Sequence, residues 1–126
     1  MTDLYGESRH HAQLERGLAR HGATDFSYTS TDTTATIEFT LDGRRLRFTF
    51  DLPDPGEDRY IRDPVTRHRR SPHIAAERWE RDVSRRSRNL TQLLEAKAAA
   101  VENGTATFEQ EWGPYEVLPG DHTVRD

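Results

Sequence analysis

The stretch Ile37–Leu52, IEFTLDGRRLRFTFDL, decides the fold. On each side of Asp42-Gly43, apolar residues alternate with polar ones, which is the period-2 pattern of a half-buried strand. Asp-Gly is typical of the two-residue turn that joins antiparallel strands, because that turn needs positive φ at both positions. Such a turn fixes the register. We expect these opposite pairs: Leu41 with Arg44, Phe39 with Leu46, Ile37 with Phe48, Glu38 with Arg47 and Thr36 with Thr49.

The residues before this hairpin predict one more strand and a helix. Phe26 and Tyr28 alternate with polar residues, which extends the hairpin to a three-stranded antiparallel meander. Ser8 can cap a helix that runs to about His21, and Gly22 is placed as its C-terminal stop.

The residues after the hairpin predict a long loop and a long helix. Prolines and glycine end the sheet, and no sustained period follows over about 53–71, so this loop is either functional or disordered. Ser71-Pro72 then opens a helix that ends near Asn103-Gly104. Its apolar side is predicted to pack on the sheet and comprises Ala76, Trp79, Val83, Leu90, Leu94, Ala98 and Val101.

Two short elements complete the predicted fold. Residues 105–112 form a short helix or an extended piece, and two short strands surround the turn at Pro119–Asp121. The whole is one α+β domain, residues 1–126: an N-terminal helix, a three-stranded antiparallel meander, a long C-terminal helix packed on the sheet, and a small terminal β-hairpin.

Composition excludes several classes of protein. The chain has no cysteine, which excludes disulfides, a thiol nucleophile and thiolate metal ligands. No apolar run approaches the roughly 20 residues of a membrane span, and residues 1–11 lack a basic and then hydrophobic leader. We expect no membrane partner and a location in the cytoplasm of a bacterial host.

Positive charge is concentrated in one segment. The chain has seventeen arginines but a single lysine, Lys97, a bias that either a GC-rich genome or selection for bidentate guanidinium contacts produces. Arg59–Arg88 holds ten arginines against four acidic residues, a net charge of +6, while the rest of the chain carries −10. This segregation predicts an oriented electrostatic surface.

The arginines of the long helix form a stripe opposite its apolar side, at Arg78, Arg81, Arg85 and Arg88. Spacing predicts that Glu77 pairs with Arg81 and that Asp82 pairs with Arg86. Asp82 can also reach Arg78 and Arg85, so the middle of the stripe is predicted to be partly neutralised. The candidate binding residues are Arg67, Arg69, Arg70, Arg81, Arg85 and Arg88. Three interpretations stay open: a solvated helix face, a phosphate-binding surface and a surface that docks on an acidic protein.

No catalytic or metal-binding pattern emerges. Histidines occur at His10, His11, His21, His68, His73 and His122, and no two have the i, i+4 spacing of metal ligands on one helical face. Pro53-Asp54 and Glu95-Ala-Lys97 match the PD…ExK pattern of metal-dependent nucleases, but that pattern places ExK on a strand and here it falls in the predicted helix. We therefore expect no metal, no cofactor and no enzymatic activity.

Nucleic-acid binding, if present, is expected to be electrostatic. Tyr60 is the single aromatic residue in the predicted basic loop, so stacking on bases has little support, and binding to DNA or RNA would be non-specific and salt-sensitive. The order α-β-β-β-α is also that of double-stranded RNA-binding domains, an analogy of fold alone.

The last third resembles a family of small bacteriophage and prophage proteins of unknown function. Their C-terminal pattern, close to KAKLEAVExGxxTFExEF and then LPDGxTV, is matched at Ala96, Lys97, Ala100, Val101, Glu102, Gly104, Thr107, Phe108, Glu109, Glu111, Leu118, Pro119, Thr123 and Val124. Trp112 stands where the family has phenylalanine. Arg47, Phe48, Leu52 and Pro53 match the family's Arg-Phe-x-x-x-Leu-Pro element. The resemblance implies a phage or prophage origin and supplies no catalytic residue.

Two functional hypotheses follow. The first is a non-enzymatic phage accessory protein that contacts nucleic acid through the arginine-rich loop and helix face. The second is a phage protein that binds and modulates a host protein, such as a defence or replication component, with the same charged face.

Overall fold

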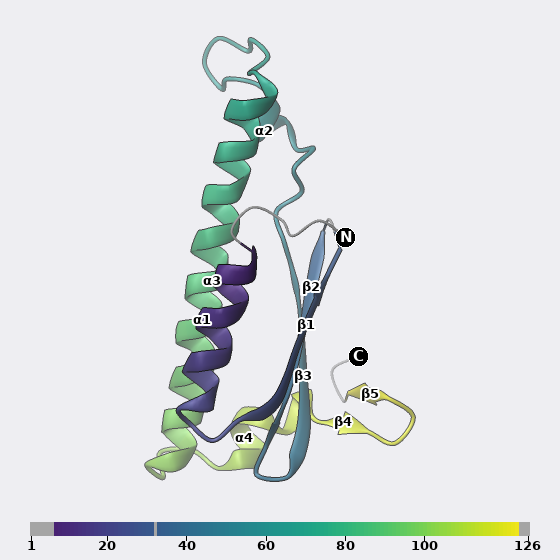
Figure 1. Cartoon of the computed structure of the whole chain (residues 1–126), viewed down its shortest axis with the longest axis vertical. Helices are drawn as coiled ribbons and strands as arrows, with labels where there is room; N and C mark the ends of the chain where they lie inside the picture. The colour runs from purple at the N-terminus through teal and green to yellow at the C-terminus, as the bar shows by residue number, and fades with distance from the viewer. Residues whose placement is uncertain (1–6, 32, 124–126) are drawn as a thin grey trace.

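The structure is a computed structural model that describes residues 7–31 and 33–123. Figure 1 shows two helices on one side of a small sheet. The elements in chain order are α1 (Glu7–Ala19), β1 (Thr24–Ser30), β2 (Thr34–Leu41), β3 (Arg44–Asp51), α2 (Asp58–Ile61), α3 (Pro72–Glu102), α4 (Phe108–Trp112), the 3-10 helix η1 (Gly113–Tyr115), β4 (Val117–Leu118) and β5 (His122–Thr123).

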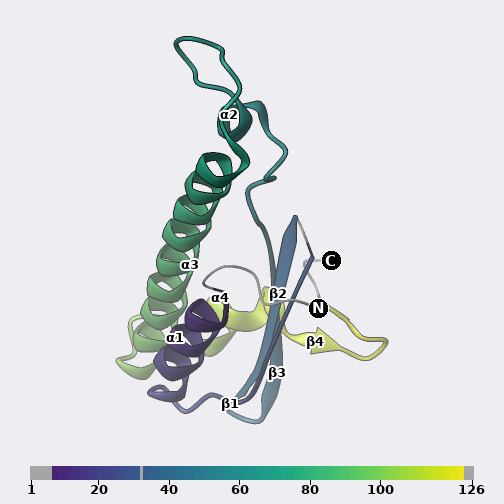
Figure 2. The ribbon, with the colours of Figure 1, turned by 45° about the horizontal axis from the view of Figure 1, so that its top comes forward.

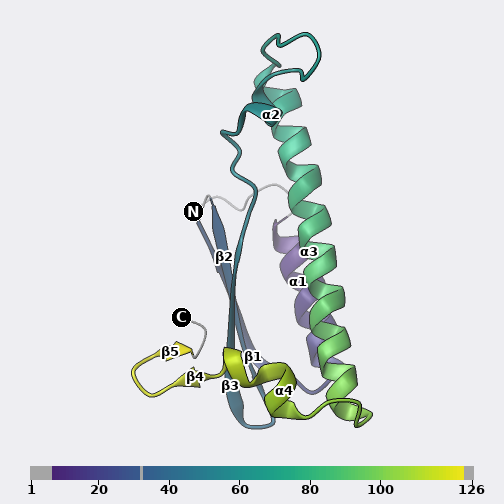
Figure 3. The same cartoon turned by 180° about the vertical axis from the view of Figure 1, so that it is seen from behind.

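The molecule has two layers. The antiparallel sheet β1-β2-β3 forms one layer, and α1 and α3 lie side by side on one face of it (Figures 1 and 3). The first turns of α3 extend past the end of the sheet and carry α2 beside them (Figures 1 and 2). The α+β prediction is confirmed, and the projecting end of α3 is the part that the sequence did not anticipate.

The predicted hairpin is confirmed in every pair. Leu41 lies opposite Arg44, Glu38 opposite Arg47 and Ile37 opposite Phe48. Asp42 and Gly43 have φ of 53° and 73°, as the two-residue turn requires. The apolar residues consequently share the face that α1 and α3 cover, and Ile37 is fully buried there.

Two apolar clusters hold the layers together. The larger one joins α1, the sheet, the second half of α3 and α4. Its Trp112 is fully buried and packs edge-on against the rings of both Phe39 and Phe48. The smaller one lies where the chain leaves β3 and contains Ala35, Leu52, Tyr60, Trp79 and Val83. The smaller cluster fixes the projecting end of α3 to the segment that follows the sheet.

Helix ends follow the sequence signals with one exception. Ser71 caps α3 by accepting a hydrogen bond from the backbone N–H of Ile74 at 3.3 Å, and Gly22 has the positive φ of a C-terminal stop. Ser8 is not a cap, because α1 already includes Glu7 and glutamate is a favourable residue at a helix start.

Two further expectations are wrong. Ala76, placed on the packing side of the long helix, is exposed, because its turn lies beyond the end of the sheet (Figure 1). The segment from 53 to 71, expected to be irregular throughout, contains the helical turn α2 and an antiparallel bridge between Arg62 and Arg69. Four helical residues are too few to give a periodic signal.

Candidate nucleic-acid interface

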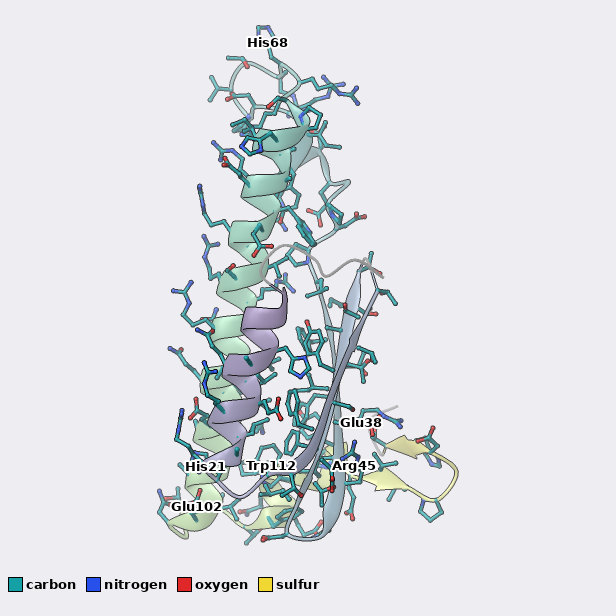
Figure 4. The ribbon with its side chains drawn as sticks, in the orientation of Figure 1. His21, Glu38, Arg45, His68, Glu102 and Trp112 are labelled. Carbon is teal, nitrogen blue, oxygen red and sulfur yellow. The ribbon has the colours of Figure 1, made fainter. Side chains whose placement is uncertain are left out.

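The arginine stripe lies on the outer side of α3. Arg78, Arg81, Arg85 and Arg88 are all exposed, and Trp79 and Val83 point the opposite way into the smaller cluster. Side chains tipped with nitrogen project along this outer side in Figure 4. The sequence thus predicted the orientation of the stripe correctly, because the apolar residues of the same helix dictate it.

The stripe is less neutralised than its spacing predicts. Glu77 lies 3.3 Å from His73 instead of pairing with Arg81, and Arg86 donates to the backbone carbonyl oxygen of Asp51 at 2.9 Å instead of pairing with Asp82. Asp82 pairs with Arg85 at 3.1 Å.

Three guanidinium groups of the stripe therefore keep their full charge at the surface. Arg78, Arg81 and Arg88 make no ion pair with any residue that the structure describes. Glu80, one of the four acidic residues of the basic segment, is only 7% exposed and accepts a hydrogen bond from Ser84, so it lies away from the stripe.

The tip, which we define as residues 62–70 after α2, is held by hydrogen bonds within its own turn. One carboxylate oxygen of Asp63 accepts the backbone N–H groups of Val65 and Thr66 at 2.8 and 3.0 Å. These two bonds, led by the one from Thr66, hold the pKa of Asp63 below its usual value. The tip is thus a defined turn.

The three candidate arginines of the tip have different surroundings. Arg70 is half-buried and donates to the backbone carbonyl oxygens of Arg59 and Tyr60, so its guanidinium closes the turn. Arg67 pairs with Asp58 of α2. Arg69 is exposed and makes no ion pair within the described part of the chain. Of the three, Arg69 is the one whose side chain is available to a ligand.

Two further arginines come from α1, which the sequence did not single out. A groove of about 210 Å³ runs between α1 and α3, and it is lined by Gln13, Arg16, Arg20, Arg88, Thr91, Gln92 and Glu95. Arg16 and Arg20 are four residues apart and so share one face of α1. That spacing was visible in the sequence, but only the packing of α1 on α3 places them beside Arg88.

The histidines are spread over the fold. His21 lies in the turn that follows α1 and contacts Glu102, the last residue of α3 (Figure 4), whereas His68 lies at the opposite end of the molecule. His11 lies 5.1 and 5.4 Å from the rings of Phe26 and Tyr28. The side chain of His10 is outside the described part. Among the described residues, no group of three or more histidine or acidic side chains gathers where a metal ion could bind.

The ExK part of the PD…ExK match lies on a helix, as the sequence predicted, and not on a strand. Glu95 and Lys97 lie on α3, and the two side chains engage different partners. Glu95 accepts from Arg20 at 2.8 Å, and Lys97 donates to the backbone carbonyl oxygen of Glu111.

Across the described residues, no helix is both long enough and apolar enough to cross a bilayer. Comparison of the chain with protein-family models, with curated proteins and with solved structures finds no match.

Proposed function

We propose that this chain is a non-enzymatic, phage-type accessory protein that contacts the phosphate backbone of nucleic acid through the arginine face of α3. One observation carries the proposal: three exposed guanidinium groups, without an ion pair among the described residues, lie along one helix face of a chain with a net charge of −4. An unneutralised cationic row on an acidic body favours an anionic polymer of regular spacing.

The surroundings of the stripe support contacts to phosphates in preference to bases. Trp79 is 8% exposed and Tyr60 only 2%, so neither ring offers a platform for stacking. Arg78 and Arg88 are ten residues apart, which corresponds to about 15 Å along the helix axis. A row of this length spans several phosphate positions and reads no base edges, so binding is expected to be independent of sequence.

The test is a fluorescence-anisotropy titration with duplex DNA, single-stranded DNA and RNA of the same length, at about 50 and 200 mM salt. Arg78→Gln and Arg81→Gln should each weaken binding and lower the salt dependence by about one released counterion. Arg45→Gln removes the same charge from the outer face of the sheet, where Arg45 contacts Glu38, and should leave binding unchanged. Absence of binding at low salt would refute the proposal.

A second candidate function rests on the apolar residues near the tip. Val65 is 87% exposed and Ile74 is 41% exposed, and Arg69 lies between them in the sequence. Apolar side chains with an unpaired arginine are typical of a protein-binding surface, which favours the modulation of a host protein. If nucleic acid does not bind, a host protein that the wild type retains after nuclease treatment and that Val65→Ser with Ile74→Ser loses would support this alternative.

A further inference from the structure

The groove lies between two helices that pack on one another, and Gly17 of α1 faces the side chain of Glu95 of α3. A Cβ atom at this position would lie 2.9 Å from the carboxyl carbon of Glu95. On either side of Gly17, Leu14 and Leu18 are 3% and 1% exposed and anchor α1 in the larger cluster. The walls of the groove are therefore two packed helices, and its polar side chains project from them.

The basic side chains of the groove differ in whether an acidic side chain pairs with them. Arg20 is held by Glu95, with 2.8 Å between Nη2 and Oε1. Arg16 and Arg88 come from opposite walls, are exposed, and make no ion pair with the residues that the structure describes. Thr91, on the α3 wall, donates its hydroxyl to the backbone carbonyl oxygen of Ser87 at 2.9 Å, so that hydroxyl is already used. The groove thus contains three guanidinium groups and one carboxylate, and two of the three guanidinium groups have no ion pair within the described part of the chain.

We propose that this groove binds one phosphate group between Arg16 and Arg88, and this inference rests on the proposed function for the source of that phosphate, a nucleic-acid strand lying on α3. Guanidinium groups match phosphate oxygens with paired N–H donors, and the amides of Gln13 and Gln92 supply further donors in the groove. The volume of about 210 Å³ is below that of pockets that enclose a whole small ligand, roughly 300 Å³ or more, and suits a single anionic group.

The groove can fix the position of one phosphate of the strand, which the stripe cannot do. Exposed arginines along one helix attract a polyanion without fixing its position, whereas two arginines from different helices hold a phosphate from two sides. Arg88 belongs to both the stripe and the groove, so the strand on α3 is anchored at the lower end of the stripe, where α1 begins to contribute.

The first arm of the test measures duplex DNA binding by anisotropy for Arg16→Gln, Arg88→Gln and the double variant, with Arg78→Gln as the matched control. Arg78 carries the same charge on the same face but lies outside the groove. Arg16→Gln should weaken binding about tenfold, the size of one charge-assisted hydrogen bond, against about twofold for Arg78→Gln. The two groove substitutions should be non-additive, because they remove one shared contact. Equal losses for Arg16→Gln and Arg78→Gln, with additive effects, would overturn the proposal.

The second arm uses inorganic phosphate at constant ionic strength and follows the side-chain Nε–Hε NMR signals of the arginines. Shifts at Arg16 and Arg88 that Arg16→Gln abolishes, with no shift at Arg78, are expected. The two arms separate the two failures. If DNA does not bind but these signals respond, the groove is a phosphate site and the proposed function is wrong; if DNA binds and the signals do not respond, the groove proposal alone is wrong. If neither responds, both are wrong.

Discussion

The indole N–H of Trp79 donates a hydrogen bond to the backbone carbonyl oxygen of Pro53. This bond joins the projecting end of α3 to the segment that leaves β3, and both partners are buried. Trp79 belongs to the smaller cluster, so this cluster and the hydrogen bond together fix the position of the basic tip relative to the sheet.

Replacing Trp79 should therefore destabilise the fold in two graded steps. Trp79→Phe keeps an aromatic ring but leaves the carbonyl oxygen of Pro53 without its donor, and it should lower the free energy of unfolding by about 1–3 kcal/mol. Trp79→Ala also creates a cavity and should cost about 3–5 kcal/mol. Urea denaturation followed by circular dichroism measures both. Equal effects of the two variants would show that the hydrogen bond, not packing, accounts for the whole loss.

Tyr60 makes stability sensitive to alkaline pH. Its hydroxyl donates to Asp82 at 2.7 Å, and burial, with this hydrogen bond second, raises the pKa of Tyr60 to about 12. Because the folded pKa lies above the unfolded value of about 10, the contribution to stability is complete below pH 10 and is lost as the pH rises towards 12. Denaturation at stepped pH should show this loss in the wild type and not in Tyr60→Phe. Parallel curves for the two proteins would contradict the assignment.

The position of Gly17, buried against the side chain of Glu95, limits the size of the residue that fits there. Gly17→Ala should be nearly neutral, because alanine favours the helix by up to about 1 kcal/mol while its methyl group displaces the flexible carboxylate of Glu95. Gly17→Leu cannot be accommodated in this way and should cost about 1–3 kcal/mol. Ala19→Leu, at an exposed position of the same helix, is the control and should change stability by less than about 0.5 kcal/mol. Thermal unfolding of the three variants gives the comparison.

The contact between Arg44 and Glu116 should make the stability of the fold depend on pH in the acid range. Arg44 donates to Glu116 through Nε at 3.0 Å, and this contact lowers the pKa of Glu116. A depressed folded pKa means that the contribution is present above the unfolded value and disappears as the pH falls through the folded value. Glu116→Gln should lose no more than about 1 kcal/mol at neutral pH, since both side chains are partly exposed, and the difference from wild type should vanish in acid. Glu109→Gln, at a more exposed partner of Arg44, should lose less at neutral pH.

The sequence predicted what depends on local rules. The register of Ile37–Leu52 follows from a two-residue turn and period 2, and the start of α3 follows from Ser71 and Pro72. The orientation of the stripe follows from the apolar side of the same helix. In each case the residues that decide the outcome are close in the chain.

What the sequence did not predict depends on residues far apart in the chain. Arg16 lines the same groove as Arg88 only because α1 packs on α3. Arg86 donates to the carbonyl oxygen of Asp51 although Asp82 is one turn away on its own helix. Arg70 reaches the carbonyl oxygen of Arg59 only because α2 forms. Helix spacing shows which partners on the same helix a side chain can reach. Which contact forms also depends on the partners that other elements bring near.

The bond from Arg86 to Asp51 has a consequence for how copies of this chain behave in crowded solution. β3 is an outer strand of the sheet, and an outer strand offers free backbone groups with which another chain can pair. At the end of β3, the guanidinium of Arg86 occupies one such acceptor and adds a positive charge beside it. A second copy that paired with this carbonyl oxygen would have to displace the guanidinium of Arg86, and it would bring its own positive charge to the same place when the two edges met.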